Sequence, residues 1–328
     1  MQTVLVSLLL LAMCSSKLVF YDEFDKLDFR KWRHDITMAG GGNNEFQIYQ
    51  NNRSTTYTNN SILYIQPVPT DEKIGENAVR NNSQYEIWGA TPGDFCTAPF
   101  NNGCKRQSDG NNYLNPVMSG KLTTVESFTF TYGRIEVRAK LPKGDWLWPA
   151  IWLMPRGNVG YPRENGGGPE TFGSTLHWGA DWTTNQFYKT RAEYTINGTT
   201  LADDFHTYGL YWDDKVIYTY LDNDTNKVLF VNHTTMSYWE RSGLSGRMNP
   251  WQFSKNKCAP FDTDFYLILN VAVGGTIGYF ADGVANKPWR DRSTRPSAEF
   301  FDNKGQWFPT WKKQDSAMQI DWVKIWDL

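Results

Sequence analysis

The segment DWLWPAIWLMPRGNVGYPRENGGGPETFGSTLHWGADW, residues 145–182, decides how this chain folds. It holds two aromatic runs that are typical of strands, Trp146–Met154 and Phe172–Trp178. Sixteen residues, Pro155–Glu170, join the two runs, and eight of these sixteen are glycine or proline. Because glycine and proline weaken strands, this connection is predicted to be a loop.

Short β-rich segments recur along the rest of the chain, between clusters of glycine, asparagine and aspartate, whereas helical periodicity is scarce. These segments are Lys17–Tyr21, Ser61–Pro67, Ser127–Leu141, Lys189–Tyr194, His206–Trp212, Lys215–Leu221, Asp264–Val273 and Ala317–Trp326. Two stretches, 33–48 and 68–119, are predicted to be mainly loop. The pattern predicts an all-β fold, a two-sheet antiparallel sandwich.

Two of the predicted strands carry further information. Tyr208–Leu221 consists of two alternating runs and predicts a hairpin that turns at Asp213-Asp214. Tyr266–Val273 is nearly continuous in apolar residues and is predicted to be a central strand. Its one polar member, Asn270, either lines a cleft or is a core amide with satisfied hydrogen bonds.

The N-terminus and the charge indicate where the protein acts. Met1–Ser16 predicts a cleaved secretory signal, because an apolar run is followed by small residues; the alternative is a buried N-terminal strand. Residues 17–328 are then predicted to form a single domain, without a membrane helix. A net charge of −2 without charged blocks gives no electrostatic reason to bind nucleic acid or an anionic membrane. We therefore expect a secreted, soluble monomer.

Aromatic residues make up 16% of the chain, which has fifteen tryptophans. A core alone rarely uses so many, so we expect some of these rings to form surfaces that stack on flat groups.

The cysteines and the sequons also fit an extracellular protein. Cys14 belongs to the predicted signal, while Cys96 and Cys104 lie eight residues apart and are predicted to form a disulfide. Cys258 is then either a buried free thiol or one half of an intermolecular bridge. Six N-x-[ST] sequons predict N-glycosylation. They are at Asn52, Asn59, Asn81, Asn197, Asn223 and Asn232.

Eight segments, in order along the chain, resemble glycoside hydrolase family 16, in particular its invertebrate branch of β-1,3-glucanases and β-1,3-glucan-binding proteins. The segments are FYDEFDKLDFRKW (20–32), GGGNNEFQIY (40–49), CTAPFNNGCKR (96–106), SGKLTTVESFTFTYGRIEVRAKLPKGDWLWPAIWLMPR (119–156), FGSTLHWG (172–179), FHTYGLYWDDKVIYTYLDN (205–223), APFDTDFYLILNVAVGG (259–275) and KPW (287–289). The resemblance covers essentially the whole chain after residue 16. It implies a concanavalin-like jelly-roll sandwich whose concave sheet binds a β-glucan chain.

The resemblance also implies a set of substrate-binding residues, which are Asn44, Gln47, Arg134, Trp148, His177 and Trp178. Tryptophan can stack on the flat C–H face of a sugar, while Asn, Gln, Arg and His can bind its hydroxyl groups. Trp146, Trp148, Ala150 and Trp152 should share one face of their strand. Alternative interpretations are that Arg134 pairs with Glu136 or Glu126, and that His177 and Trp152 belong to the core. No cofactor and no metal site are predicted.

Enzymes of this family need two carboxyl groups about 5 Å apart, which come from a Glu-x-Asp-x-x-Glu run on one strand. This sequence passes from LMPRGN directly to VGYPRENGGGPETFGSTLHW, without that run. Glu164 and Glu170, the only carboxylates left in between, are six residues apart among glycines, and we do not expect them to act as a pair. With this run missing, the resemblance predicts no catalytic residue. It also predicts that one central strand of the concave sheet is missing, which leaves a widened or unpaired slot in that sheet.

Three hypotheses for the function remain open. The first is a secreted β-1,3-glucan-binding protein of the pattern-recognition type, which does not cut its ligand. The second is an endo-β-1,3-glucanase, inferred from membership of the family. The third is an exon-skipped, inert form of such a glucanase. The missing acidic run favours the first.

Overall fold

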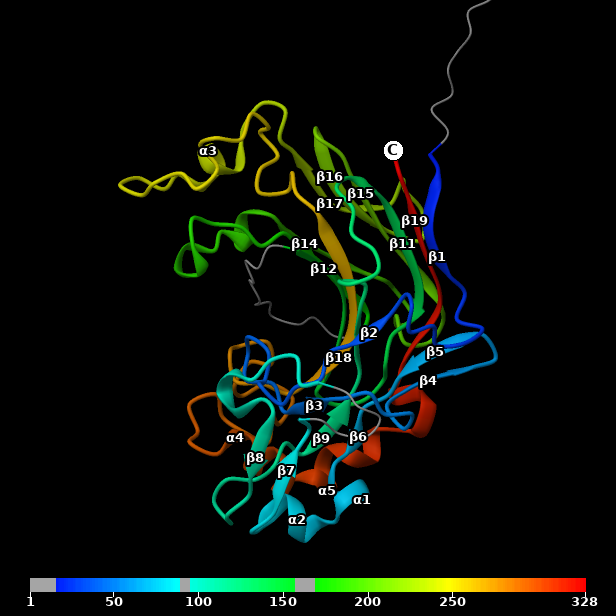
Figure 1. The fold of residues 1–328 in the computed structure, drawn as a ribbon, viewed down its shortest axis with the longest axis vertical. Helices are drawn as coiled ribbons and strands as arrows, with labels where there is room; N and C mark the ends of the chain where they lie inside the picture. The colour runs from blue at the N-terminus through cyan, green and yellow to red at the C-terminus, as the bar shows by residue number, and fades with distance from the viewer. Residues whose placement is uncertain (1–15, 89–94, 157–168) are drawn as a thin grey trace, which may run out of the picture.

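The computed structural model describes residues 16–88, 95–156 and 169–328, and most of its regular structure is strand (Figure 1). An eight-stranded antiparallel sheet has the order β17-β16-β15-β11-β19-β5-β4, and β1 also pairs with β19. Its strands are β1 Leu18–Asp22, β4 Thr56–Asn59, β5 Ile62–Ile65, β11 Gly133–Lys140, β15 His206–Trp212, β16 Val216–Leu221, β17 Lys227–Asn232 and β19 Met318–Trp326.

A second, four-stranded sheet has the order β12-β18-β10-β2. Its strands are β2 Arg33–His34, β10 Lys121–Thr123, β12 Leu147–Pro155 and β18 Phe265–Val273. β12 and β18 are antiparallel without a break in register, from Leu147 opposite Val273 to Pro155 opposite Phe265. β18 is almost entirely buried, which confirms its prediction as a central strand.

Smaller elements cover the ends of this sandwich. Three further sheets pair β3 (Gln47–Tyr49), β9 (Val117–Ser119) and β6 (Val68–Pro69); β7 (Gln84–Glu86) and β8 (Lys105–Gln107); and β13 (Thr171–Thr175) and β14 (Arg191–Thr195). The α-helices are α1 Asp71–Ile74, α2 Glu76–Arg80, α3 Tyr238–Ser242, α4 Pro296–Asp302 and α5 Lys304–Trp307. Short 3₁₀ helices span Phe100–Asn102, Trp182–Thr184, Phe187–Lys189, Phe308–Thr310 and Lys313–Ser316.

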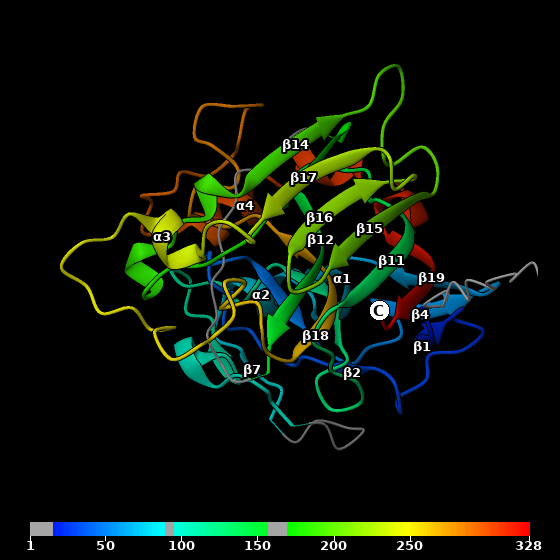
Figure 2. The same cartoon turned by 90° about the horizontal axis from the view of Figure 1, so that it is seen from above.

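One hydrophobic core lies between the two large sheets. Alternate side chains of a strand point to opposite faces, so β18 buries Leu267, Leu269 and Val271 against residues such as Ile135 and Val137 of β11. The β13-β14 hairpin lies beside β17 in the view from above (Figure 2), and the ring of Phe172 packs edge-on against Tyr208 of β15. The predicted all-β antiparallel sandwich is confirmed.

The predicted hairpin at Asp213-Asp214 is also confirmed, because β15 and β16 pair across this turn. The Asp213 carboxylate accepts the backbone N–H groups of Lys215 (2.8 Å) and Val216 (2.7 Å), which fixes the turn.

The stretch 33–48 is mainly loop, as predicted, and contains only β2 and the start of β3. The stretch 68–119 contains the short elements β6–β9, α1 and α2 between its loops. One expectation is wrong. Trp146 does not share a face with Trp148. It precedes β12 with a φ of 65°, and its ring is buried against Trp289 and Phe280. A positive φ breaks the alternation of an extended strand at that position.

β12 lies at the edge of its sheet in the described part of the chain, since it pairs there only with β18, and β13 pairs only with β14. Hydrogen bonds from Gly274 N to Trp146 O and from Arg156 N to Asp264 O flank β12. The backbone groups of its odd-numbered residues therefore point away from β18. Two of these residues, Pro149 and Pro155, have no N–H, which suits an edge strand. The missing neighbouring strand stays a prediction, because residues 157–168 lie outside the described residues.

The predicted disulfide between Cys96 and Cys104 is present, and it belongs to a small second core beneath β3 and β9. Of the sequon asparagines, Asn52 is half-buried, and the others are exposed: Asn59, Asn81, Asn197, Asn223 and Asn232. Glycosylation stays a prediction. The predicted signal, Met1–Ser16, lies outside the described residues except for its last residue.

His34 gives the fold a dependence on pH. Its side chain is buried, and neither ring nitrogen has a hydrogen-bond partner among the described residues. Burial, reinforced by the Arg53 charge, lowers the pKa of His34 to about 3. The native imidazole therefore stays neutral at a pH at which the unfolded chain already binds a proton, and acid favours the unfolded state.

We predict that the free energy of unfolding falls as the pH drops below 6.5, the ordinary pKa of histidine, toward 3. His34 should contribute about 1.4 kcal/mol per pH unit to this loss. Between pH 6.5 and pH 5, the free energy of unfolding measured in urea should therefore fall by about 2 kcal/mol less in His34→Leu than in the wild type. The same loss in both proteins would contradict this assignment.

Candidate functional site

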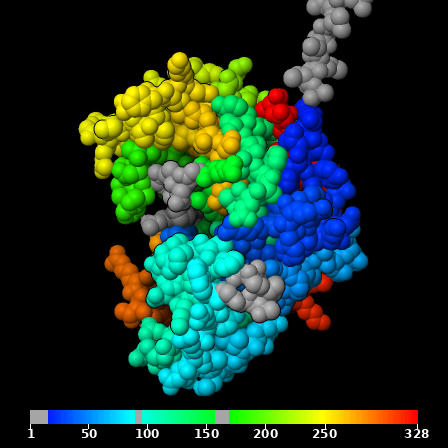
Figure 3. Space-filling view, in the orientation of Figure 1, coloured from blue at the N-terminus to red at the C-terminus, as the bar shows by residue number. Residues whose placement is uncertain are grey.

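The outer face of the β2-β10-β18-β12 sheet, here called the groove face, collects several of the predicted site residues. It points away from the eight-stranded sheet, between the segments around α3 and around β7-β8 in Figure 1, and the surface is hollowed there in Figure 3. The register places alternate residues on this face. They are Trp148, Ala150, Trp152 and Met154 of β12, Tyr266, Ile268, Asn270 and Ala272 of β18, and Lys121 and Thr123 of β10.

A chain of hydrogen bonds holds the centre of the groove face. The indole N–H of Trp152 donates to Asn270 Oδ1 (2.7 Å), and Asn270 Nδ2 donates to the hydroxyl of Tyr49 (3.0 Å). The sequence left open whether Asn270 lines a cleft or is a core amide with satisfied hydrogen bonds. Both interpretations apply, because Asn270 is a buried amide with two partners and it also fixes the Trp152 ring on the groove face. Trp152 is half-buried rather than a core residue.

An ion pair lies beside Trp152. Lys121 Nζ is 2.8 Å from Asp35 Oδ2 and 5.2 Å from the centre of the Trp152 ring. Burial opposes the lysine charge, but the attraction of Asp35 outweighs this effect and raises the pKa of Lys121. The centre of the groove face therefore combines an aromatic ring with a fixed cation, an arrangement that can stack on a ring and donate hydrogen bonds.

The loop before β3 carries two predicted residues, Asn44 and Gln47. Asn44 is exposed, and its Nδ2 donates to Thr276 Oγ1 (3.0 Å). Gln47 is buried, and its Oε1 accepts the backbone N–H of Val273 at the end of β18 (2.8 Å). Asn44 can therefore meet a ligand directly, whereas Gln47 attaches this loop to the sheet.

Glu45, between these two residues, is a carboxyl group that the sequence analysis did not single out. Asn43 Nδ2 (3.0 Å) and Gln47 Nε2 (3.4 Å) donate to its oxygens. Burial nevertheless raises the pKa of Glu45. Its charge also contributes to raising the pKa of Tyr49, which burial raises most strongly. Glu45 therefore lies close to the polar centre of the groove face.

Trp148 lies at the other end of the groove face, where it is stacked on Tyr279. The ring centres are 3.6 Å apart, and the planes differ by 8°. Tyr279 belongs to the glycine-rich loop after β18, which the sequence analysis left without a role. The available signal was an aromatic pair, Tyr279-Phe280, next to a predicted central strand.

The structure separates Arg134 from this group. Arg134 lies on β11, on the outer face of the eight-stranded sheet, so the hydrophobic core lies between it and the groove face. Its guanidinium donates to the Glu136 carboxylate (2.5 Å), which is the salt bridge considered as an alternative. It also donates to the Tyr220 hydroxyl (3.0 Å). Its predicted role in substrate binding has no support from this placement.

His177 and Trp178 follow β13. Trp178 is fully buried, and its indole N–H donates to Thr190 Oγ1 (2.7 Å), so it offers no surface to a sugar here. His177 is half-buried, stacks on Phe187 and has its Nδ1 3.0 Å from Asn185 Nδ2. His177 and Trp178 therefore do not form one binding surface.

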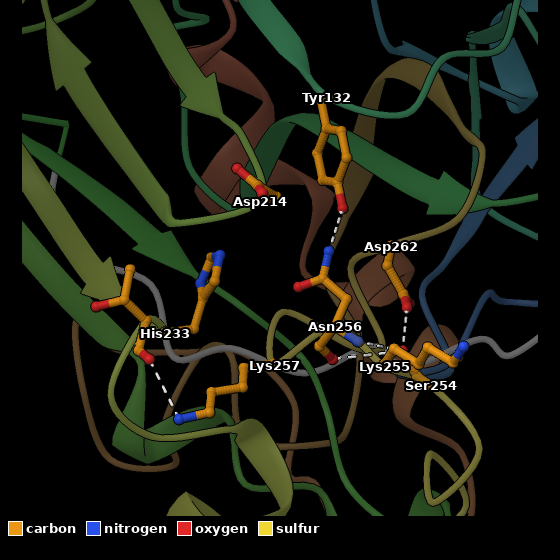
Figure 4. A pocket seen from close by; sticks show the side chains of 9 residues that line it. Tyr132, Asp214, His233, Ser254, Lys255, Asn256, Lys257 and Asp262 are labelled. Carbon is orange, nitrogen blue, oxygen red and sulfur yellow. Dashed lines mark hydrogen bonds between the residues drawn. The ribbon is translucent and has the colours of Figure 1, made fainter.

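A separate polar cavity of about 640 Å³ lies at the tip of the β15-β16 hairpin (Figure 4). Its lining residues are Tyr132, Asp214, His233, Thr234, Ser254, Lys255, Asn256, Lys257 and Asp262. Behind it, the Tyr132 hydroxyl is 3.2 Å from Cys258 Sγ. Cys258 is a buried free thiol, as the first of the two interpretations held, and burial raises its pKa to about 11. Polar and charged side chains line most of this cavity, so it suits sugar stacking less well than the groove face does.

Comparisons with known proteins identify the family. The family model described as Glycosyl hydrolases family 16 matches residues 104–254. A β-1,3-glucan-binding protein of Penaeus monodon is 43% identical to this chain, over 95% of the chain and 90% of that protein. The chain belongs to glycosyl hydrolase family 16. β-1,3-Glucan-binding protein 1 of Manduca sexta is 28% identical, over 96% of the chain and 66% of that protein.

Solved structures show the same fold. The catalytic domain of an endo-1,3-β-glucanase (laminarinase) from Thermotoga petrophila matches with a TM-score of 0.58 at 22% identity, over 95% of this chain and 98% of that one. The laminarinase of Rhodothermus marinus matches with a TM-score of 0.56 at 23% identity, over 95% and 97%. The predicted family 16 jelly-roll sandwich is thus confirmed.

Asp35 and Glu45 are carboxylates that lie near the centre of the groove face of this family 16 protein. Asp35 is paired with Lys121, and Glu45 is held by Asn43 and Gln47. No hydrogen bond among the described residues joins Asp35 to Glu45. Of the carboxylates between β12 and β13, Glu170 directly precedes β13, and Glu164 lies outside the described residues. The absence of a catalytic pair stays a prediction.

We predict that Asn270→Ala destabilises the fold, because it leaves the Trp152 indole and the Tyr49 hydroxyl without their partner. Each buried unpaired group costs about 1–3 kcal/mol, so the free energy of unfolding should fall by roughly 2–4 kcal/mol. Urea unfolding measures this change, and Asn44→Ala, at an exposed amide, should lose less than about 1 kcal/mol. Equal losses in the two variants would contradict the role of Asn270.

Proposed function

We propose that this protein is a secreted β-1,3-glucan-binding protein that holds a glucan chain on the groove face and does not hydrolyse it. The single observation that carries the proposal is the alignment of Trp148 and Trp152 on one strand, beside fixed polar groups of Asn270 and Lys121. Aromatic rings stack on the C–H faces of sugars, and the polar groups between them can bind hydroxyl groups.

Strand geometry supports a polymeric ligand. Trp148 and Trp152 are four residues apart on β12, and a strand rises about 3.3 Å per residue, so their attachment points are about 13 Å apart. This separation exceeds the size of a single sugar ring. A chain of several sugars can therefore contact both rings, which favours a polysaccharide over a monosaccharide.

Similarity to named proteins supports the choice of sugar. The Penaeus monodon and Manduca sexta relatives are both named as β-1,3-glucan-binding proteins. The net charge of −2 gives no reason for the chain to prefer a charged polymer such as nucleic acid. We therefore propose a neutral β-1,3-glucan as the partner, bound by a monomer without a cofactor.

Secretion and a role in pattern recognition are part of the same proposal. The apolar N-terminus is typical of a secretory signal, and the Cys96–Cys104 disulfide suits an oxidising compartment. No helix in the described ranges is both long and apolar enough for a membrane span. A secreted protein that binds a glucan without cutting it is suited to recognising glucan-bearing surfaces.

The second candidate function is an endo-β-1,3-glucanase. It is favoured by the fold shared with the two laminarinases. The residues favour binding alone, because Asp35 and Glu45 already have other partners and the sequence lacks the Glu-x-Asp-x-x-Glu run.

We predict that isothermal titration with laminarin detects binding to the full-length chain, and that Trp148→Ala weakens this binding about tenfold, or ~1.4 kcal/mol, through loss of one stacking surface. Arg134→Ala is the control on the opposite face and should leave the affinity unchanged. Absence of heat with the wild type would refute glucan binding, and a loss in Arg134→Ala equal to that in Trp148→Ala would refute the groove face as the site.

We predict that incubation with laminarin releases no reducing sugar above the level without protein, because the sequence lacks the Glu-x-Asp-x-x-Glu run that supplies the two carboxyl groups of a retaining mechanism. The measurement is a reducing-end assay on the wild type and on a Glu164→Gln/Glu170→Gln variant. Release by the wild type would establish the glucanase, and its loss in the variant would place the catalytic groups in the segment between β12 and β13.

A further inference from the structure

The Trp148–Tyr279 stack leaves no space for a sugar between its two rings. The ring centres are separated by 3.6 Å and the planes are nearly parallel, so the rings are in van der Waals contact. A sugar can therefore reach Trp148 only on the face that is turned away from Tyr279, unless Tyr279 moves. In the first case Tyr279 supports the Trp148 ring from behind. In the second case Tyr279 blocks the face of Trp148 that the sugar would contact.

Phe280 holds Tyr279 against Trp148. Its ring lies edge-on to Tyr279, at 4.7 Å and 87°, and edge-on to Trp146, at 5.4 Å and 90°. A third edge-on contact joins Phe280 to Trp289 at 6.1 Å. Trp146 and Trp289 are both buried in the main core. Tyr279 is therefore anchored through Phe280 to residues that do not move independently of the fold.

Lys287 fixes the backbone of the same loop. Its side chain is fully buried, and Nζ donates to the Phe280 carbonyl oxygen (2.9 Å), to Asp282 (2.7 Å) and to Asp291. The ammonium group also lies 4.8 Å from the centre of the Trp289 ring. A buried cation with this many partners keeps a single geometry, because any rearrangement would leave its charge unpaired. The loop that carries Tyr279 is thus held at Phe280 and directly after it.

We propose that Tyr279 is a positioning residue for glucan binding, which holds the Trp148 indole so that its opposite face is ready to stack on a sugar ring. This inference rests on the proposed function and adds a residue to it. Trp148 lies on an edge strand and is half-buried, so without Tyr279 its ring would sample several orientations. Binding would then have to order the ring, and this cost would lower the affinity.

The anchored geometry distinguishes support from blocking. A blocking ring has to leave when the ligand binds, which would break the contacts of Phe280 and disturb the loop fixed by Lys287. A supporting ring keeps all these contacts in the bound state. The observed arrangement therefore fits a permanent backing for Trp148.

The test is a double-mutant cycle, measured by isothermal titration of laminarin into the full-length chain. Tyr279→Ala should weaken binding roughly fivefold, and Tyr279→Phe, which keeps the ring, should retain the wild-type affinity. In the Trp148→Ala background, Tyr279→Ala should cause no further change, because its effect acts through Trp148. Tyr21→Ala, at an exposed tyrosine on β1, is the matched control and should bind as the wild type does.

Three results would overturn the inference while leaving glucan binding intact. These are tighter binding by Tyr279→Ala, unchanged binding by Tyr279→Ala, or the same loss in both backgrounds. Circular dichroism and thermal unfolding of each variant show whether the fold is retained. If Tyr279→Ala unfolds, Tyr279→Leu, which removes the flat ring but fills much of its space, should still weaken binding, and unchanged binding by Tyr279→Leu would overturn the inference. Absence of laminarin binding by the wild type would instead overturn the proposed function, and the inference with it.

Discussion

The unbroken antiparallel pairing of β12 with β18 is the constraint on which the rest of the structure depends. Its register decides which side chains enter the core and which form the groove face. A shift of β12 by one residue against β18 would turn Trp152 toward the core and Ile151 and Leu153 away from it. Because this exchange would remove the apolar contacts between the sheets, core packing and the groove face specify the same register.

The polar groups of the groove face are stabilised as a connected set rather than singly. Trp152, Asn270 and Tyr49 share hydrogen bonds, and Lys121 with Asp35 supplies a charge pair beside them. Buried polar groups are costly unless each has a partner, and a satisfied network gives one fixed geometry. The groove face is therefore rigid before a ligand arrives, which limits the entropy lost on binding.

The sequence allowed the sandwich, the β15-β16 hairpin, the central strand β18 and the disulfide to be predicted, because alternation and turn residues act over short distances. The site was predicted less completely. Family motifs give the order of residues along the chain, but not the face on which each one lies. Arg134 was therefore grouped with Trp148 although the core separates them, and Trp178 is buried in it. Tyr279 and Lys121 were missed because their roles come from contacts between distant segments.

The central claim is that the groove face is where a β-1,3-glucan binds. Hydrogen–deuterium exchange of the full-length chain, with and without laminarin, tests this claim directly, because a bound chain slows the opening of the backbone it covers. The account predicts slower exchange in β12 and in the loop from Gly274 to Lys287, and unchanged exchange in β15, β16 and β17. Protection of β15–β17 instead, or no protection at a laminarin concentration that saturates binding, would contradict it.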